Sequence, residues 1–96
     1  MNKKMPTEFE ITKVTLFLKI MADTTRAKIL FAIKNGPKSV AEIQELVGAT
    51  QSEVSHQLSL MRRVKIVSTK RDGNKIFYSL VDSEIAKILE IAKNHI

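Results

Sequence analysis

The segment from Thr50 to Arg63 carries polar side chains whose types and spacing suit hydrogen bonding to the edges of DNA bases. Val54, Leu58 and Met61 recur at helical spacing and predict a buried face. The opposite side is predicted to present Gln51, Ser52, Ser55, Gln57, Ser59 and Arg62. Gln pairs with adenine through two hydrogen bonds and Ser reaches several base edges, whereas an ordinary exposed helix carries more Lys and Glu. The pattern favours a base-reading helix over the alternative, a polar surface helix that is rich in Ser and Gln.

Basic residues gather at the end of this segment and around a predicted turn that follows it. They are Arg62, Arg63, Lys65, Lys70, Arg71 and Lys75. Lys and Arg at the edges of a groove neutralise phosphates, which makes DNA affinity fall as salt rises. A solvated run of charge explains any single basic residue here, but it explains the whole group less well. His56 lies beside the reading face, where a DNA contact or a structural hydrogen bond suits it better than a metal ion.

The net charge points to the same class of partner. The chain of 96 residues has a net charge of +6 and a pI near 9.8, a balance that attracts polyanions. Residues 49–81 hold six Lys or Arg against two Asp or Glu, so the excess surrounds the candidate reading helix. A membrane-binding helix would place its bases opposite a broad apolar face, whereas these lie on a helix end and a turn. Double-stranded DNA is therefore the expected partner, and no membrane is expected.

The composition argues against an enzyme. The chain has no Cys, two His and three Gly, and it lacks a Ser/His/Asp set, a phosphate-binding Gly loop and a His-x-x-x-His helix. At this length residues 1–96 are expected to form one domain without a deep catalytic cavity. The absence of Cys fits a cytoplasmic protein, and the longest apolar run, residues 29–33, is far too short to cross a membrane.

Two capped helices joined by a tight turn predict a helix-turn-helix unit. Ser39 and Glu42 form a capping box, Gly48 closes that helix, and Thr50 with Glu53 begins the next one. The inward positions expected for the first of these helices are Val40, Ile43, Leu46 and Val47. In such a unit the second helix is offered to the major groove of DNA.

The segments that precede this unit predict two more helices. Residues 7–21 carry two apolar stripes, and because one core cannot bury both, the spare stripe is expected to pack on another subunit. Asp23 or Thr24 caps the second helix, which is expected to stop where Gly36 adopts the left-handed conformation.

The segments that follow the unit predict a hairpin and a final helix. Residues 66–70 and 75–80 are β-branched and aromatic runs around an Asp-Gly turn. Acidic residues from Asp82 onward begin the last helix, as the helix dipole favours. The expected fold class is therefore mainly α with a small β-hairpin.

Several motifs together resemble the ArsR family of repressors. They are Ala22-Asp-Thr-Thr-Arg-Ala-Lys-Ile-Leu30, Ser39-Val-Ala-Glu42, Ser52-Glu-Val-Ser-His-Gln-Leu58, Leu60-Met-Arg-Arg63 and Tyr78-Ser-Leu80. The resemblance covers nearly the whole chain and implies a winged helix-turn-helix of order ααααββα, a homodimer through its first and last helices. It also implies a repressor that leaves a pseudo-palindromic operator when an inducer, often a metal ion, binds. Thr24 stands where many members have Pro, which that position favours but does not require.

The residue pattern and the resemblance together define the expected DNA contacts. These are Ser39, Gln51, Ser52, Ser55, His56, Gln57, Ser59, Arg62, Arg63, Lys70, Arg71 and Lys75. Two other functions stay open, a winged-helix protein-interaction module without operator binding and a DNA-binding regulator without a metal response. Charge favours DNA, because an interaction module has no need to surround a Ser/Gln face with basic residues.

The resemblance also indicates a candidate metal sensor on the last helix. Metal-responsive members use either cysteines on the helix that here begins at Ser39, which this chain lacks, or an acid/His set that maps onto Asp82, Glu84 and His95. Glu84 stands where zinc-sensing members often have His, and the last His of their pattern falls beyond Ile96. DNA binding requires no cofactor, so a divalent ion such as zinc would act as an effector.

The spacing of these three residues requires two chains for a shared ion. Glu84 and His95 lie about 16 Å apart along a helix, so His95 would come from an antiparallel partner, with water or the Ile96 carboxylate completing the set. An oxygen-rich set of this kind binds zinc more weakly than His-rich or thiolate sets do. The alternative gives each residue an ordinary role: Asp82 caps the helix, Glu84 is a first-turn acid, and His95 is an exposed terminal residue.

Overall fold

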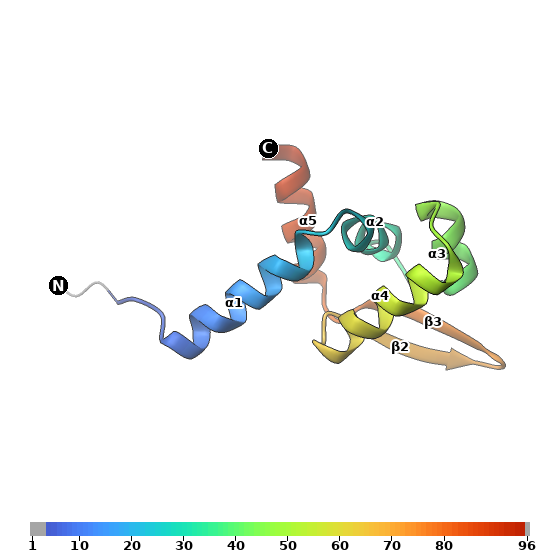
Figure 1. Cartoon of the computed structure of the whole chain (residues 1–96), viewed down its shortest axis with the longest axis horizontal. Coiled ribbons are helices and arrows are strands. Elements are labelled where there is room, and N and C mark those ends of the chain that lie inside the picture. The colour runs from blue at the N-terminus through green and yellow to red at the C-terminus, as the bar shows by residue number, and fades with distance from the viewer. Residues whose placement is uncertain (1–3, 96) are drawn as a thin grey trace.

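The computed structural model describes residues 4–95, in which four helices precede a β-hairpin and one helix follows it (Figure 1). The elements are α1 (Glu8–Met21), α2 (Thr24–Ile33), β1 (Lys38–Ser39), α3 (Val40–Val47), α4 (Gln51–Arg63), β2 (Val67–Asp72), β3 (Lys75–Leu80) and α5 (Ser83–His95). The expected class, mainly α with a small β-hairpin, is confirmed. None of the helices within residues 4–95 combines the length and the apolar character needed to cross a membrane.

Short-range signals in the sequence set most helix ends. Thr7, Ser39 and Thr50 each accept a hydrogen bond from the backbone N–H three residues later, and a Glu at that position completes a capping box. Asp23 caps α2, and Gly48 ends α3 with a left-handed φ of 77°. The turn between α3 and α4 is therefore as tight as the helix-turn-helix prediction requires.

The end of α2 differs from the prediction for Gly36, which does not have a positive φ. Lys34, the C-cap, keeps a right-handed φ of −57°, and its N–H donates to the carbonyl of Phe31 at 3.3 Å. The N–H of Gly36 donates to the carbonyl of Ile33, also at 3.3 Å. Each of these hydrogen bonds joins an N–H to the carbonyl three residues earlier, so the carbonyls of Phe31 and Ile33 are satisfied without a left-handed residue. The prediction of a left-handed Gly36 was wrong.

The inner face of α3 is narrower than predicted. Ile43 is fully buried and Val40 and Val47 are half-buried, but Leu46 is 63% exposed. At 100° per residue Leu46 lies roughly 90° from the centre of the stripe formed by the other three side chains. A helix of eight residues that packs on α2 and α4 buries only that stripe, so the prediction of an inward Leu46 was wrong.

The predicted hairpin forms and gains a third strand, β1. The sheet is antiparallel with the order β1-β3-β2, and Lys38 pairs with Tyr78. The hairpin strands run on to the Asp72–Lys75 pair, so only Gly73 and Asn74 form the turn, where Arg71–Asn74 was predicted as the connection. Gly73 has a φ of 66°, as a hairpin turn of this length requires.

One apolar core lies where α2, α3, α4, the base of the hairpin and α5 meet. Its buried members are Ile20, Ile29, Leu30, Ile33, Ile43, Val54, Leu58, Met61, Ile66, Val67, Ile85 and Leu89. Helix α1 supplies only Ile20 to this set, because the helix extends away from the body and only its C-terminal end packs on α2 (Figure 1).

Candidate nucleic-acid interface

Helix α4 turns its apolar face to the core and its polar face to solvent. Val54, Leu58 and Met61 are fully buried against the rest of the fold. The exposed side chains of α4 include Gln51, Ser52, Ser55, His56, Ser59, Arg62 and Arg63, all predicted to contact DNA. The sequence therefore placed the exposed face of this helix correctly at these positions.

Gln57 differs from the other polar residues of α4. Its side chain is half-buried, and its Oε1 accepts a hydrogen bond of 3.0 Å from Nη1 of Arg26 on α2. The amide oxygen that would pair with adenine already has a partner within the fold. A base contact by Gln57 stays a prediction with a competing structural role.

Lys65 connects α4 to the hairpin in a left-handed conformation, with a φ of 63°. Its N–H donates to the carbonyl of Arg62 at 3.0 Å, and the N–H of Ile66 donates to that of Met61 at 2.9 Å. This is the Schellman arrangement, which usually places Gly at the left-handed position because a side chain there costs about 1 kcal/mol or more. The fold thus holds a strained basic residue between the reading helix and the hairpin.

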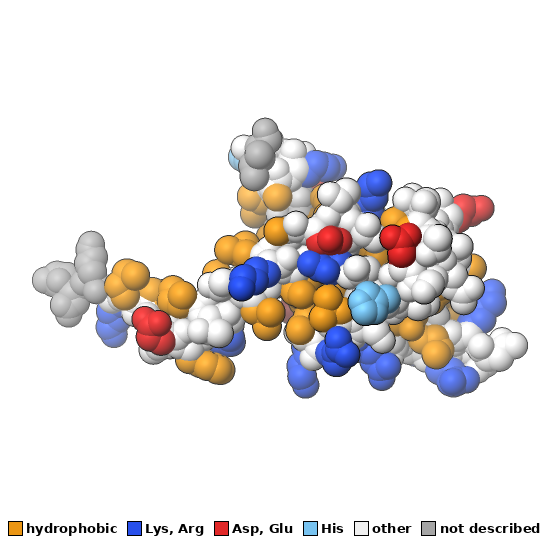
Figure 2. Space-filling model, in the orientation of Figure 1, with side chains coloured by type: hydrophobic (Ala, Val, Ile, Leu, Met, Phe, Trp, Pro, Cys, Tyr) orange, Lys and Arg blue, Asp and Glu red, His pale blue; other side chains and the backbone are white. Residues whose placement is uncertain are grey.

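The pairing register distributes the basic residues over both faces of the hairpin. Lys70 pairs with Phe77 and Lys75 with Asp72, whereas Arg71 pairs with Ile76 at the intervening position. Because alternate residues of a strand point to opposite faces, Lys70 and Lys75 share one face and Arg71 lies on the other. Figure 2 shows Lys and Arg side chains along the lower edge of the molecule, beneath α4 and along the hairpin.

Ser39 and Glu42 form a tight cap at the start of α3. The N–H of Ser39 donates to Oε1 of Glu42 at 2.8 Å, and Ser39 Oγ accepts from the N–H of Glu42 at 3.3 Å. The backbone N–H of Ser39 is the main reason that the pKa of the Glu42 carboxyl lies below its ordinary value. Ser39 is half-buried and serves as a cap, and its predicted DNA contact remains untested.

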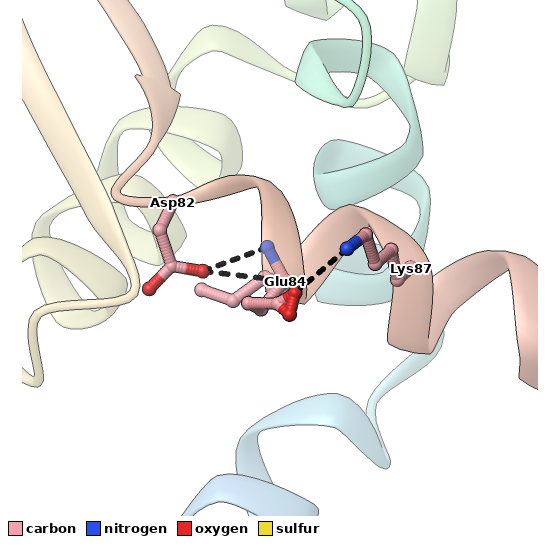
Figure 3. A network of polar contacts seen from close by, with 4 residues as sticks. Asp82, Glu84 and Lys87 are labelled. Carbon is pink, nitrogen blue, oxygen red and sulfur yellow. Dashed lines mark hydrogen bonds and ion pairs between the residues drawn. The ribbon is translucent and has the colours of Figure 1, made fainter.

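The three candidate metal ligands have partners within the chain, and Figure 3 shows those of Asp82 and Glu84. Asp82 Oδ1 accepts from the N–H groups of Glu84 at 2.9 Å and Ile85 at 3.3 Å, and Glu84 Oε1 lies 2.9 Å from Lys87 Nζ. At the far end of α5, His95 Nδ1 lies 3.1 Å from the carbonyl oxygen of Ile91. Residues 4–95 hold no group of three His, Asp or Glu side chains within one chain that could bind a metal. The Ile96 carboxylate lies outside the described residues.

Arg26 is the polar residue whose structural role the sequence did not predict. It lies in the first turn of α2, where a cation opposes the helix dipole, and that placement is the signal that could have marked it. The guanidinium instead points to the C-terminal end of α1 and to α4, through hydrogen bonds to two carbonyls and to Gln57.

A helix-turn-helix with an exposed polar second helix, followed by a basic hairpin, defines the class of winged helix-turn-helix DNA-binding proteins. A family model described as bacterial regulatory protein, arsR family, matches residues 23–69. The chain belongs to the ArsR family of bacterial regulators, and it is a DNA-binding transcriptional regulator.

Individual relatives and solved structures agree with this assignment. The HTH-type transcriptional regulator NmtR of Mycobacterium tuberculosis is 39% identical over 83 residues, which are 86% of this chain and 69% of NmtR. The structure of HlyU from Vibrio cholerae superposes with a TM-score of 0.82 at 29% identity, covering 90% of this chain and 94% of HlyU. The structure of the antimony-specific transcriptional repressor AntR superposes with a TM-score of 0.84 at 29% identity, covering 97% of this chain and 85% of AntR.

Proposed function

We propose that this chain is a homodimeric repressor that binds a pseudo-palindromic DNA operator. The observation that carries the proposal is the exposed Ser- and Gln-containing face of α4, with basic residues at its C-terminal end and on the adjacent hairpin. In this proposal residues 1–96 form one unit with dimerisation helices at both ends, which acts in the cytoplasm. AntR is named a repressor and a relative of this chain, HlyU, is named an activator, so the direction of regulation needs its own measurement.

The proposed contacts fall into two groups. The side chains proposed to meet base edges are Gln51, Ser52, Ser55, His56 and Ser59. Those proposed to meet phosphates are Ser39, Arg62, Arg63, Lys70, Arg71 and Lys75. Short hydroxyl and amide side chains let a helix approach the floor of the major groove, and the longer basic side chains reach the backbone on its rims.

A second copy of the chain accounts for the apolar side chains left exposed on α1 and α5. They are Phe9, Ile11, Val14, Leu16, Leu18, Ile88 and Ile91. A groove of about 280 Å³ lies between α1 and the start of α5, where Leu16 and Phe17 face Val81 and Ile85. Figure 2 shows apolar side chains along both projecting helices, on the side of the molecule away from the hairpin.

The surface area also fits a dimer. The chain exposes 6920 Å², whereas a compact monomer of this mass exposes roughly 5,500 Å². The excess of about 1,400 Å² is larger than the roughly 800 Å² that each partner buries in a standard stable interface. A dimer through α1 and α5 would present two copies of α4 to successive major grooves of one duplex.

Selection from a random duplex library, followed by gel-shift titration, tests the operator proposal. The expected outcome is a selected duplex with two inverted half-sites, bound about a thousandfold or more tightly than random DNA at physiological salt. Affinity for both duplexes should fall steeply as salt rises. Binding without sequence preference would contradict the proposal, and expression of a reporter downstream of the selected duplex would give the direction of regulation.

A metal effector is a second part of the proposal, and it rests on the family together with three exposed side chains. Asp82, Glu84 and His95 are all exposed, and the cap uses only one oxygen of Asp82. The bond to the Ile91 carbonyl requires the proton on Nδ1 of His95, which leaves Nε2 as the metal-binding atom. We propose that the carboxylates of one chain and His95 of a second chain bind a divalent ion such as zinc.

Calorimetry with zinc tests this metal site. Wild type and His56→Ala should release the same heat, because His56 lies on α4 and not on α5, whereas His95→Ala should bind zinc at least about tenfold more weakly. Indistinguishable isotherms for wild type and His95→Ala would contradict the proposed zinc site and leave the DNA-binding proposal intact.

A further inference from the structure

The Arg26 side chain joins the dimer helix α1 to the reading helix α4. Its Nε donates to the carbonyl of Ile20 at 2.8 Å, its Nη2 to that of Lys19 at 3.4 Å, and its Nη1 to Oε1 of Gln57 at 3.0 Å. Both carbonyls belong to the last turn of α1, where a helix leaves carbonyls without i+4 partners. The Lys19 carbonyl also accepts from the N–H of Ala22, the C-cap of α1, at 3.2 Å. A single planar guanidinium thus holds groups from two helices in fixed relative positions.

Arg26 is itself held in place by α2. Its backbone N–H donates to Oδ2 of Asp23, the N-cap of α2, at 3.0 Å, and its side chain is half-buried. The cation lies at the negative end of the α1 dipole, which favours it electrostatically. Helix α1 packs on α2, and α2 packs on α4, so the guanidinium spans a junction that is already in contact. The guanidinium therefore links the C-terminal end of α1 to α4 through hydrogen bonds on one planar group.

We propose that Arg26 and Gln57 are positioning residues that set the distance and angle between the two reading helices of a DNA-bound dimer. This inference rests on the proposed function, in which α1 takes part in the dimer interface and α4 enters the major groove. The two half-sites of an operator must lie one helical turn of DNA apart, or a multiple of it. The joint between α1 and α4 therefore determines which half-site spacing the dimer accepts.

The experiment measures spacing discrimination, the ratio of affinities for two duplexes. One is the symmetric duplex that wild type selects from a random library, and the other carries one extra base pair at its centre, which moves the half-sites apart by about 3.4 Å. Gln57→Met removes the link to α4 and keeps the bonds from Arg26 to α1. Arg26→Met removes all three bonds, and Lys28→Met is the matched control, since it removes an exposed cation from the same helix.

Gln57→Met and Arg26→Met are each expected to reduce spacing discrimination about tenfold. The double variant should lose no more than either single variant, because both remove one shared link. Lys28→Met should discriminate as wild type does. Gln57→Glu should retain the discrimination, since a carboxylate accepts the Arg26 bond more strongly than an amide does, even if its charge weakens DNA binding overall.

Three results would overturn the inference while the proposed function stands. They are wild-type discrimination in Gln57→Met, additive losses in the double variant, and a changed base preference in Gln57→Glu, which would make Gln57 a base-reading residue. A wild-type chain that selects no duplex would overturn the proposed function and this inference with it. Thermal unfolding of each variant identifies any variant that fails to fold. If Arg26→Met fails to fold, Gln57→Met still tests the inference.

Discussion

At the residue scale, Lys65 combines a strained backbone conformation with a basic side chain. Its left-handed φ of 63° lies at a Schellman position where Gly is the usual residue. Strain of this kind persists where the surrounding structure holds it, and it gathers at functional sites. Lys65 follows Arg62 and Arg63 at the end of α4, so we expect its charge to add to the attraction of phosphates there.

Replacing Lys65 separates these two effects. Lys65→Gly should raise the free energy of unfolding by about 1 kcal/mol, because Gly adopts this conformation without the steric cost, and should weaken DNA binding. Lys65→Met keeps the strain and removes the charge, so it should weaken DNA binding equally without the gain in stability. Urea unfolding and gel-shift titration measure the two quantities. A Lys65→Gly chain no more stable than wild type would contradict the strain argument.

Ser55 and Arg71 should affect DNA binding in different ways. Ser55→Ala removes a hydroxyl from the exposed face of α4, so we expect a loss of about 1–3 kcal/mol in discrimination between the selected duplex and a mutated one. Arg71→Ala removes a charge from the hairpin and should weaken binding to all duplexes alike, with a shallower salt dependence. Gel-shift titrations over a range of salt concentrations distinguish the two, and the reverse pattern would mean that the roles of α4 and the hairpin are misassigned.

At the scale of elements, Glu90 fastens α5 to the end of α2. Its carboxylate lies 2.9 Å from Nζ of Lys34, whose side chain is only 16% exposed, and 3.1 Å from Nζ of Lys93. The hydrogen bond from Lys34, followed by that from Lys93, holds the pKa of Glu90 below its ordinary value. A carboxyl with a lowered pKa in the folded state stabilises the fold above its unfolded-state pKa, and that contribution is lost as pH falls through the folded-state value.

Acid should therefore weaken the attachment of α5. We expect wild type to lose stability between about pH 5 and pH 3, and Glu90→Gln to be less stable at neutral pH with a smaller acid dependence. The dependence should not vanish, because the Glu42 pKa is lowered as well. Glu84→Gln is the matched control on α5, since its pair with Lys87 is exposed on both sides. The free energy of unfolding in urea is measured across this pH range. If it falls with pH equally in wild type and Glu90→Gln, Glu90 does not contribute to the acid dependence.

At the scale of the whole molecule, the shape is that of half an assembly. The radius of gyration is 14.9 Å, whereas a compact chain of this length has about 12.5 Å. The difference arises from α1 and α5, which project from the body and carry apolar side chains into solvent (Figure 1). Such a shape is stable when a second chain covers those helices.

A charge placed on α1 should prevent this pairing without harming the fold of each chain. Leu18 is 57% exposed, so Leu18→Glu costs the isolated chain little, but it would place a carboxylate in the proposed interface. We expect the dimer dissociation constant to rise about 30-fold or more. Leu46→Glu is the control, because Leu46 is exposed to a similar extent, 63%, but lies on α3. Sedimentation velocity over a concentration series measures the effect, and equal dissociation constants for the two variants would contradict an interface through α1.

The sequence by itself determined the features that depend on neighbouring residues. The capping boxes at Ser39 and Thr50, the left-handed Gly48 and the buried stripe of α4 all follow from groups within one or two turns of each other. The exposed face of α4 follows too, because a helix that buries one stripe exposes the opposite side. Local rules predict such features because the interacting groups are close in the chain.

Only the tertiary structure decided the features that join distant segments. Strand β1 forms because Lys38 meets Tyr78, and Gln57 turns inward because Arg26, 31 residues earlier, reaches it. Leu46 is exposed because α2 and α4 cover only one stripe of α3. Each of these outcomes depends on how helices and strands pack together, and no local spacing encodes that packing. The exposed face of α4, apart from Gln57, could therefore be predicted from the residues alone, whereas the hydrogen bonds that join α4 to α1 through Arg26 exist only in the folded chain.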